Sequence, residues 1–145
     1  MLVTRYSYIR LFAVGLVVLR LAFWSSAAEA GHDEEYIDTI PAERVKRLAD
    51  SGEKIFFVDL RSLNEFQKIR LPGARSIPIG ELQKRFAEIP KSGRVILYCA
   101  CPSGGVDEAY GYLTLRDKGH RNVSVLEEGI AGWVKRKYPV DTGPN

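Results

Sequence analysis

The chain is poor in the residues that bind metals or build disulfide frameworks. It has only two cysteines and two histidines among 145 residues. Two cysteines are too few for a disulfide scaffold. Cys99 and Cys101 are separated by one residue and lack the spacing and partners of a zinc site, and His32 and His120 are distant in sequence. We therefore predict no metal site.

The chain also lacks a strong charge of either sign. Its formal net charge is +3, with 21 basic and 18 acidic residues. The first 30 residues hold three of the basic residues and one of the acidic ones, so the rest of the chain is nearly neutral. No stripe of lysine and arginine with interleaved aromatic residues is present. This composition argues against a nucleic-acid partner.

The longest apolar run, Leu11–Trp24, is short for a membrane span and is interrupted by Arg20. It follows a positively charged start, and Ala28 and Ala30 fit the small-residue pattern of a signal-peptidase site. We predict that residues 1–30 are a cleaved signal peptide, with an uncleaved membrane anchor as the alternative. Either interpretation places the body outside the cytoplasm, as a secreted or periplasmic protein. Contact with the membrane is expected only if the signal is not cleaved.

The rest of the chain alternates helical patterns with apolar runs. Residues 31–38 are an acidic lead-in, and 39–142 form the predicted domain. Buried strands are expected at 55–60, 95–99 and 123–126, with a short extended piece at 76–79. Helices are expected from Pro41 to Ala49, after Ser62 in a capping box with Glu65, and over 81–89, 107–118 and 130–136. This alternation predicts a small parallel α/β domain.

Three segments together resemble the rhodanese (sulfurtransferase) domain family. The first, within 58–78, contains Val-Asp-Leu-Arg, Glu-Phe and Leu-Pro-Gly-Ala-Arg-Ser-Ile-Pro. The second is the run Val95–Cys99 and the loop behind it. The third, within 122–140, contains Asn-Val, Leu-Glu-Glu-Gly-Ile-Ala-Gly-Trp and Tyr-Pro-Val. The resemblance covers roughly residues 39–140 and implies a rhodanese-like fold, a small central parallel sheet flanked by helices on both faces.

The resemblance also implies a chemistry. Family members carry a catalytic cysteine in the loop after the central strand, where backbone N–H groups and a helix N-terminus favour the thiolate. That thiolate takes a sulfane sulfur from a donor, becomes a persulfide and passes the sulfur to a thiol or cyanide acceptor. The resemblance also implies that no metal or organic cofactor is needed. The expected partners are a sulfur donor and a thiol acceptor, either of which can be a protein.

Two cysteines compete for the catalytic role. Cys101 fits the family's loop length to Gly119 better and begins a Cys-Pro loop, so we favour it as the nucleophile. Cys99 is the alternative because it directly follows Tyr98, the residue that ends the strand. If Cys101 is catalytic, Cys99 is a small buried apolar residue, a resolving thiol, or half of a strained Cys99–Cys101 disulfide. The predicted active-site loop comprises Pro102, Ser103, Gly104, Gly105, Val106 and Asp107.

The loop departs from the family pattern in its charge. Thiosulfate-using members carry a lysine or arginine there, whereas this loop ends in Asp107 and Glu108. Both acids suit the start of a helix, but they also repel an anionic donor. We therefore expect a neutral or cationic donor, such as a protein persulfide. Asp59 and Arg61 are candidate supporting residues, and a structural ion pair is the simplest role for Arg61.

Two other functions fit the same sequence. One is a catalytically idle rhodanese fold that binds a protein partner through the acidic mouth of the loop. The other is a thiol redox protein that uses Cys99 and Cys101 as a pair.

Overall fold

The computed structural model describes residues 36–100 and 105–144. The chain divides into two compact units, Met1–Glu34 and Glu35–Asn145, and all described residues belong to the second. The predicted signal peptide, most of the acidic lead-in and the loop residues 101–104 lie outside the described residues.

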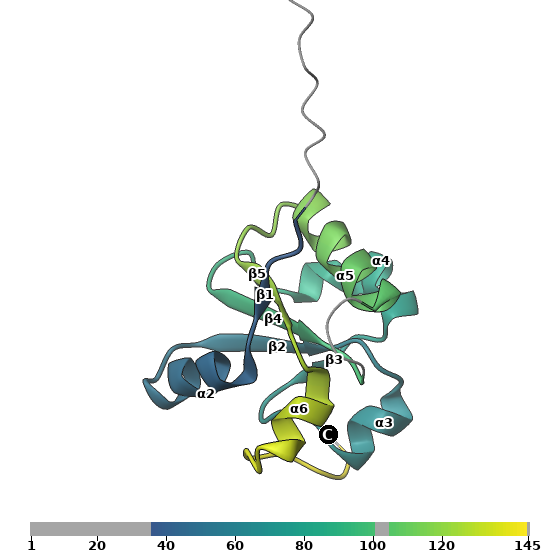
Figure 1. The fold of residues 1–145 in the computed structure, drawn as a ribbon. Coiled ribbons are helices and arrows are strands. Elements are labelled where there is room, and N and C mark those ends of the chain that lie inside the picture. Colours follow the sequence, from purple (N-terminus) through teal and green to yellow (C-terminus); the bar gives the residue numbers. More distant parts are fainter. Residues whose placement is uncertain (1–35, 101–104, 145) are drawn as a thin grey trace, which may run out of the picture. The chain divides into compact units, whose positions relative to one another are not determined.

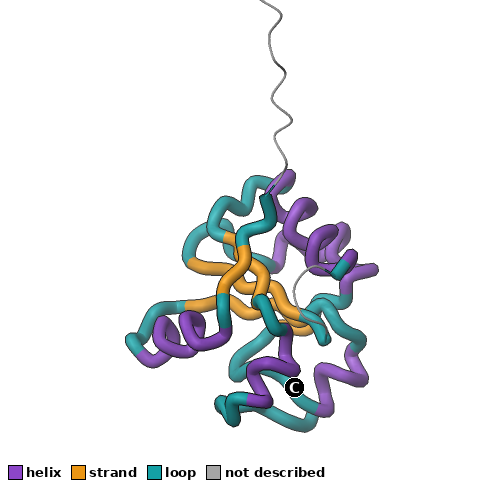
Figure 2. The backbone as a smooth tube through the Cα atoms, in the orientation of Figure 1, coloured by secondary structure: helices purple, strands orange, loops and turns teal. Residues whose placement is uncertain are grey.

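The second unit is built on a five-stranded parallel sheet (Figures 1 and 2). Its strands are β1 (Thr39–Ile40), β2 (Ile55–Asp59), β3 (Arg75–Ser76), β4 (Arg94–Tyr98) and β5 (Val123–Leu126), in the spatial order β1-β5-β4-β2-β3. All four strand pairs are parallel. The register of β2 and β4 runs from Ile55 opposite Arg94 to Asp59 opposite Tyr98, so these two strands end side by side.

Helices cover both faces of the sheet (Figure 1). They are α2 (Ala42–Asp50), α3 (Leu63–Lys68), α4 (Leu82–Arg85), α5 (Val106–Asp117) and α6 (Gly129–Lys135), with two 3-10 turns, η1 (Ile79–Glu81) and η2 (Phe86–Glu88). Helices α2, α3 and α6 contribute to one hydrophobic cluster, and α4 and α5 contribute to the other. The predicted α/β architecture with helices on both faces is confirmed.

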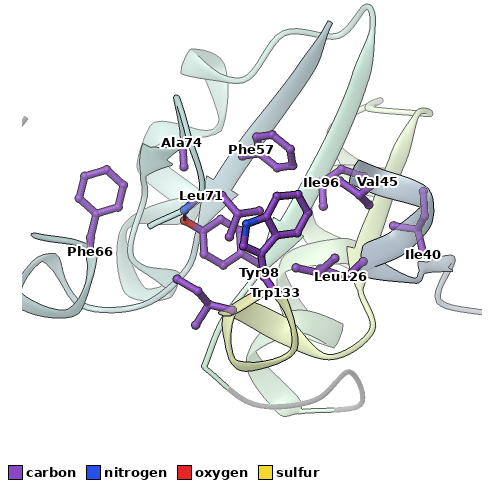
Figure 3. Packing of buried hydrophobic residues seen from close by; sticks show 12 residues of the cluster. Ile40, Val45, Phe57, Phe66, Leu71, Ala74, Ile96, Tyr98, Leu126 and Trp133 are labelled. Atoms are coloured by element: carbon purple, nitrogen blue, oxygen red, sulfur yellow. Dashed lines mark hydrogen bonds between the residues drawn. The ribbon is translucent and has the colours of Figure 1, made fainter. Parts of the chain in front are cut away.

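The alternation of side chains along β4 divides the core into these two clusters. Ile96 and Tyr98 face the first cluster, where Tyr98 lies beside Leu71 and Trp133 (Figure 3). Leu97 and Cys99 belong to the second. Because β4 is covered on both sides, its run is almost continuously apolar, as in other central parallel strands. Each fully buried aliphatic side chain stabilises the folded state by roughly 1.5–3 kcal/mol relative to an exposed one.

Local sequence signals explain how the elements beside the sheet begin and end. Ser62 and Glu65 form the predicted capping box of α3, in which each side chain meets the other residue's backbone N–H. Gly73 turns the chain toward β3 with a φ of 71°, a conformation that glycine adopts without steric cost. The Trp133 Nε1–H donates a hydrogen bond to the Pro139 carbonyl at 2.8 Å and so fixes the chain after α6.

Three details differ from the sequence prediction. The predicted helix over 81–89 is instead η1, α4 and η2 in succession. Pro90 pushes Ile89 into an extended conformation (φ −89°, ψ 126°), and the last turn tightens before it. Pro41 is the N-cap of α2 and not part of its first turn.

The edge strand β1 is the third difference, since Thr39 and Ile40 are too short a segment to show a periodic pattern. Among the described residues, the helices are all too short or too polar to cross a membrane.

Candidate functional site

A cavity of about 380 Å³ opens where β2 and β4 end. Its lining residues come from the segments after β2 and β4, from α3, from the segment that includes η1 and from the start of α5: Leu60, Arg61, Ser62, Glu65, Pro78, Ile79, Gly80, Cys99, Ala100 and Asp107. The carboxyl ends of parallel strands are the usual place for ligand sites in open α/β sheets. The fold therefore places the two ends that flank the predicted loop, Cys99 with Ala100 and the start of α5, at this edge of the sheet.

Cys99 lies at the end of β4 and is 8% exposed. It belongs to the hydrophobic cluster under α5, and its carbonyl accepts a hydrogen bond from the Ile130 N–H at 3.0 Å. Of the three roles left open for Cys99, its burial fits that of a small buried apolar residue, and Cys99 also lines the cavity. The predicted nucleophile Cys101 and the loop residues Pro102, Ser103 and Gly104 lie outside the described residues.

Asp59 and Arg61 form a buried ion pair beneath the cavity. The Arg61 Nε–H donates to Asp59 Oδ1 at 2.9 Å, and its Nη2–H donates to Oδ2 at 2.6 Å. The backbone N–H of Arg61 also donates to Asp59 Oδ1 at 3.0 Å. Burial lowers the pKa of Arg61, but the hydrogen bond and charge of Asp59 outweigh it, so the net pKa is raised. The ion pair that the sequence analysis gives as the simplest role for Arg61 is thus present.

Arg61 also interacts with residues outside the ion pair. Its Nη2–H donates to the Ile69 carbonyl at 2.6 Å, and its guanidinium lies 5.7 Å from the Tyr98 ring centroid. The Tyr98 hydroxyl accepts a hydrogen bond from the Leu71 N–H at 3.2 Å. Burial raises the pKa of Tyr98, and the negative charge of Asp59 raises it further, so Tyr98 is a neutral phenol. This network fixes the ends of β2 and β4 against the chain that follows α3.

Helix α5 begins at the edge of the cavity. Gly105 is its N-cap, and Val106, Asp107 and Glu108 form its first turn. Asp107 is exposed and lines the cavity, whereas Glu108 is 1% exposed. Neither carboxylate oxygen of Glu108 has a hydrogen-bond partner among the described residues. A Cβ atom on Gly105 would lie 2.4 Å from Glu108 Oε2, so the glycine leaves room for this buried carboxyl group.

The electrostatics of the cavity are set by few groups. Arg61 is its one cationic lining residue in the described chain, and Asp59 already neutralises it. Glu65 accepts hydrogen bonds from the Ser62 hydroxyl and backbone N–H, which lower the pKa of Glu65 and keep it ionised. Together with Asp107, it leaves the cavity with an excess of negative charge.

The fold brings three of the sequence-predicted residues together at the cavity, namely Arg61, Cys99 and Asp107. Asp59 lies beneath it, and Gly105 and Val106 begin the adjoining helix. The sequence prediction missed the cavity wall made by Pro78, Ile79 and Gly80, and it assigned Ser62 and Glu65 only to a helix cap. The signal for this wall was the Ile-Pro-Ile segment after β3. Because β3 pairs in parallel with β2, the segments that follow these two strands lie at the same edge of the sheet.

No group of three or more His, Cys, Asp or Glu side chains that could hold a metal ion occurs within residues 36–100 and 105–144.

Comparison with known proteins agrees with this geometry. The family model described as rhodanese-like domain matches residues 41–136. A sulfurtransferase from Allochromatium vinosum is 30% identical over 95 residues, which are 66% of this chain and 85% of that protein. A thiosulfate sulfurtransferase structure from Pseudomonas aeruginosa superposes with a TM-score of 0.67 at 30% identity, covering 77% of this chain and 21% of that chain.

The same domain also occurs within larger proteins. An HTH-type transcriptional regulator from Mycobacterium tuberculosis is 34% identical over 106 residues, which cover 73% of this chain and 46% of the regulator. The region that matches this chain covers 55% of the Bacillus subtilis protein YrkF. The chain thus spans about half the length of these two curated relatives.

Proposed function

Because this chain belongs to the rhodanese-like domain family, we propose that it carries sulfane sulfur as a cysteine persulfide and delivers it to a thiol acceptor. The observation that carries the proposal is the cavity at the ends of β2 and β4. Cys99 and Ala100 line this cavity, and the sequence continues from them directly into Cys101. A cysteine is therefore presented at the site where open α/β sheets bind ligands.

Cys101 is the proposed sulfur carrier, and Cys99 is the alternative. A carrier thiol must be reached by both the donor and the acceptor. Cys99 is buried in the hydrophobic cluster under α5, which supports assigning the reactive role to its neighbour. Gly105, Val106 and Asp107 complete the proposed active-site loop, and Asp59 with Arg61 holds its base.

The chemistry needs no external oxidant or reductant. The carrier thiolate attacks the outer sulfur of a donor persulfide, the donor's S–S bond breaks, and the donor leaves as a thiolate. In the second step an acceptor thiolate attacks the outer sulfur of the protein persulfide and restores the carrier thiolate. Each step forms one S–S bond and breaks one. Helix α5, with 12 residues, supplies the partial positive charge of its N-terminus to the thiolate.

We also propose that the protein acts outside the cytoplasm. The proposal rests on the signal-like sequence of residues 1–30, with its positive start, apolar run and small residues before residue 31.

Single-turnover transfer tests this function. The full chain, kept in mild detergent because of its apolar segment, is loaded with cysteamine persulfide, a donor without net charge, freed of excess donor and mixed with cyanide. We expect about one thiocyanate per chain, because cyanide takes up a single sulfane sulfur. The yield should persist in Cys99→Ser and disappear in Cys101→Ser.

Each other result has a definite meaning. Loss only in Cys99→Ser would move the carrier role to Cys99. No thiocyanate from the wild type, with both thiols still titratable, would replace the proposal with the protein-binding module. Simultaneous and reversible loss of both thiols would replace it with the redox protein.

A further inference from the structure

The charges around the cavity point to one class of acceptor. We propose that the acceptor is a protein thiol that lies beside a basic side chain and an apolar side chain. This inference rests on the proposed sulfur-carrier function and specifies its acceptor.

The first argument is the uncompensated negative charge. Arg61 is committed to Asp59 through two side-chain hydrogen bonds, at 2.9 and 2.6 Å, and is not available to a ligand. Residues 100–106 contain no Lys, Arg, Asp or Glu, so the segment leading to α5 cannot balance the carboxylates. The positive charges of Arg61 and Lys68 act on Glu65 and help to lower its pKa, so the exposed Asp107 is the main carboxylate that attracts a positively charged acceptor and repels an anionic one.

The second argument is the apolar rim. Leu63 is 54% exposed and follows the lining residue Ser62, whereas Val106 is 84% exposed and precedes the lining residue Asp107. They are the first residues of α3 and α5, the helices on two sides of the cavity. A small thiol would leave both side chains in water, whereas a protein segment that carries the thiol would cover them.

The two features together describe the acceptor segment. Its cysteine enters the cavity toward the carrier persulfide, a neighbouring Lys or Arg meets Asp107 and Glu65, and a neighbouring apolar residue packs on Leu63 or Val106. Sulfur passes as before, since the acceptor thiolate takes the outer sulfur and the carrier leaves as a thiolate.

Charge selectivity is tested with three small thiols. The full chain is loaded with cysteamine persulfide and freed of excess donor, and the rate of persulfide loss is measured with cysteamine, 2-mercaptoethanol and mercaptoacetate. Each rate is compared between the wild type and Asp107→Asn, so the intrinsic reactivity of each thiol cancels. We expect the substitution to lower the rate of persulfide loss with cysteamine, relative to the rate with mercaptoacetate, by roughly three- to tenfold. Added salt should weaken this effect.

Asp117→Asn is the matched control because Asp117 is the exposed last residue of the same helix. Ten residues separate it from Asp107, about 15 Å along the helix axis and beyond the screening length at physiological salt. It should leave all three rates unchanged.

The apolar contact is tested with short peptides in which cysteine stands between lysine and either leucine or serine. Val106→Ser should slow transfer to the leucine peptide by about two- to fivefold and leave the serine peptide unchanged. Val134→Ser on α6, where the side chain is 41% exposed, is the control.

The outcomes separate this inference from the function on which it rests. A persulfide that forms but reacts with all thiols in the same ratio in wild type and Asp107→Asn would overturn the inference and leave the sulfur carrier standing. A Val106→Ser effect equal for both peptides would refute the apolar contact. If no donor yields a persulfide, both proposals fail together.

Discussion

The Arg61 guanidinium and the Asp59 carboxylate are joined by two side-chain hydrogen bonds, with only 6% and 0% of the two side chains exposed. The pair lies at the end of β2, next to the cavity that contains Cys99. Its geometry is the two-point fork that arginine forms with carboxylates. Arg61 is thereby fixed as part of the floor of the site and is not a mobile anion-binding residue.

Removing both members of this pair should cost less than the sum of the two single removals. Arg61→Met leaves Asp59 buried without its cation, and we expect unfolding to become easier by about 3–5 kcal/mol. Asp59→Asn should have a comparable cost. The double substitution should cost less than the sum of the two, which urea denaturation of the four proteins would measure. Strict additivity would contradict the coupling.

Gly105 should tolerate a side chain poorly. Gly105→Ala places a methyl group 2.4 Å from Glu108 Oε2, so the Glu108 carboxyl group must leave its buried position. We expect a loss of about 1–3 kcal/mol in unfolding free energy, measured by denaturant titration.

Two companion variants control this prediction. Gly80→Ala also lies at the cavity but has no atom within 4 Å of the new methyl group, so its effect should stay within about 0.5 kcal/mol. In a Glu108→Ala background, the further cost of Gly105→Ala should shrink, since the clashing atom is gone. An unchanged cost would show that Glu108 is not the cause.

The link between α2 and α6 should make stability depend on pH. The Arg136 Nε–H donates to Glu43, its Nη2–H donates to Glu128 Oε1 at 2.5 Å, and hydrogen bonding from Arg136 lowers the pKa of Glu43. The folded state thus binds the Glu43 proton more weakly than the unfolded state. This contribution is present above the unfolded pKa, near 4.5, and is lost as the pH falls through the lower folded value.

Glu43→Gln should therefore be less stable than the wild type at about pH 7, and this difference should shrink as the pH falls below the unfolded pKa. Thermal unfolding at a series of pH values measures this difference. In an Arg136→Gln background the pH dependence of the difference should become smaller, because the hydrogen bond from Arg136 is the largest cause of the lowered pKa of Glu43. A constant difference at all pH values would exclude the ion pair as its source.

The sequence predicted those parts of the fold that rest on local patterns. Three kinds of signal were sufficient to predict an element or its end: the apolar runs at β2, β4 and β5, the Ser62–Glu65 capping box, and the glycine after α5. The edge strand β1 could not be predicted, because its two residues are extended only through pairing with β5. The broken helix at 79–88 likewise depends on the turn that Pro90 forces.

The site was predictable only in part for the same reason. The order Asp59, Arg61, Cys99 and Asp107 could be recognised as a pattern, but their convergence follows from parallel pairing of β2 with β4. The burial of Glu108 and its contact with Gly105 depend on how α5 packs, and a charged residue in a first helical turn is normally exposed. Sequence patterns do not report such exceptions.

The central claim, a cysteine that carries sulfane sulfur, is tested most directly by intact mass spectrometry. The full chain is incubated with cysteamine persulfide, which has no net charge, or, separately, with thiosulfate, and the wild type is compared with Cys99→Ser and Cys101→Ser. We predict a gain of about 32 Da, the mass of one sulfur, from the persulfide donor, much less from thiosulfate, and no gain in Cys101→Ser. A wild-type mass unchanged by either donor, with both thiols still reactive, would contradict the account.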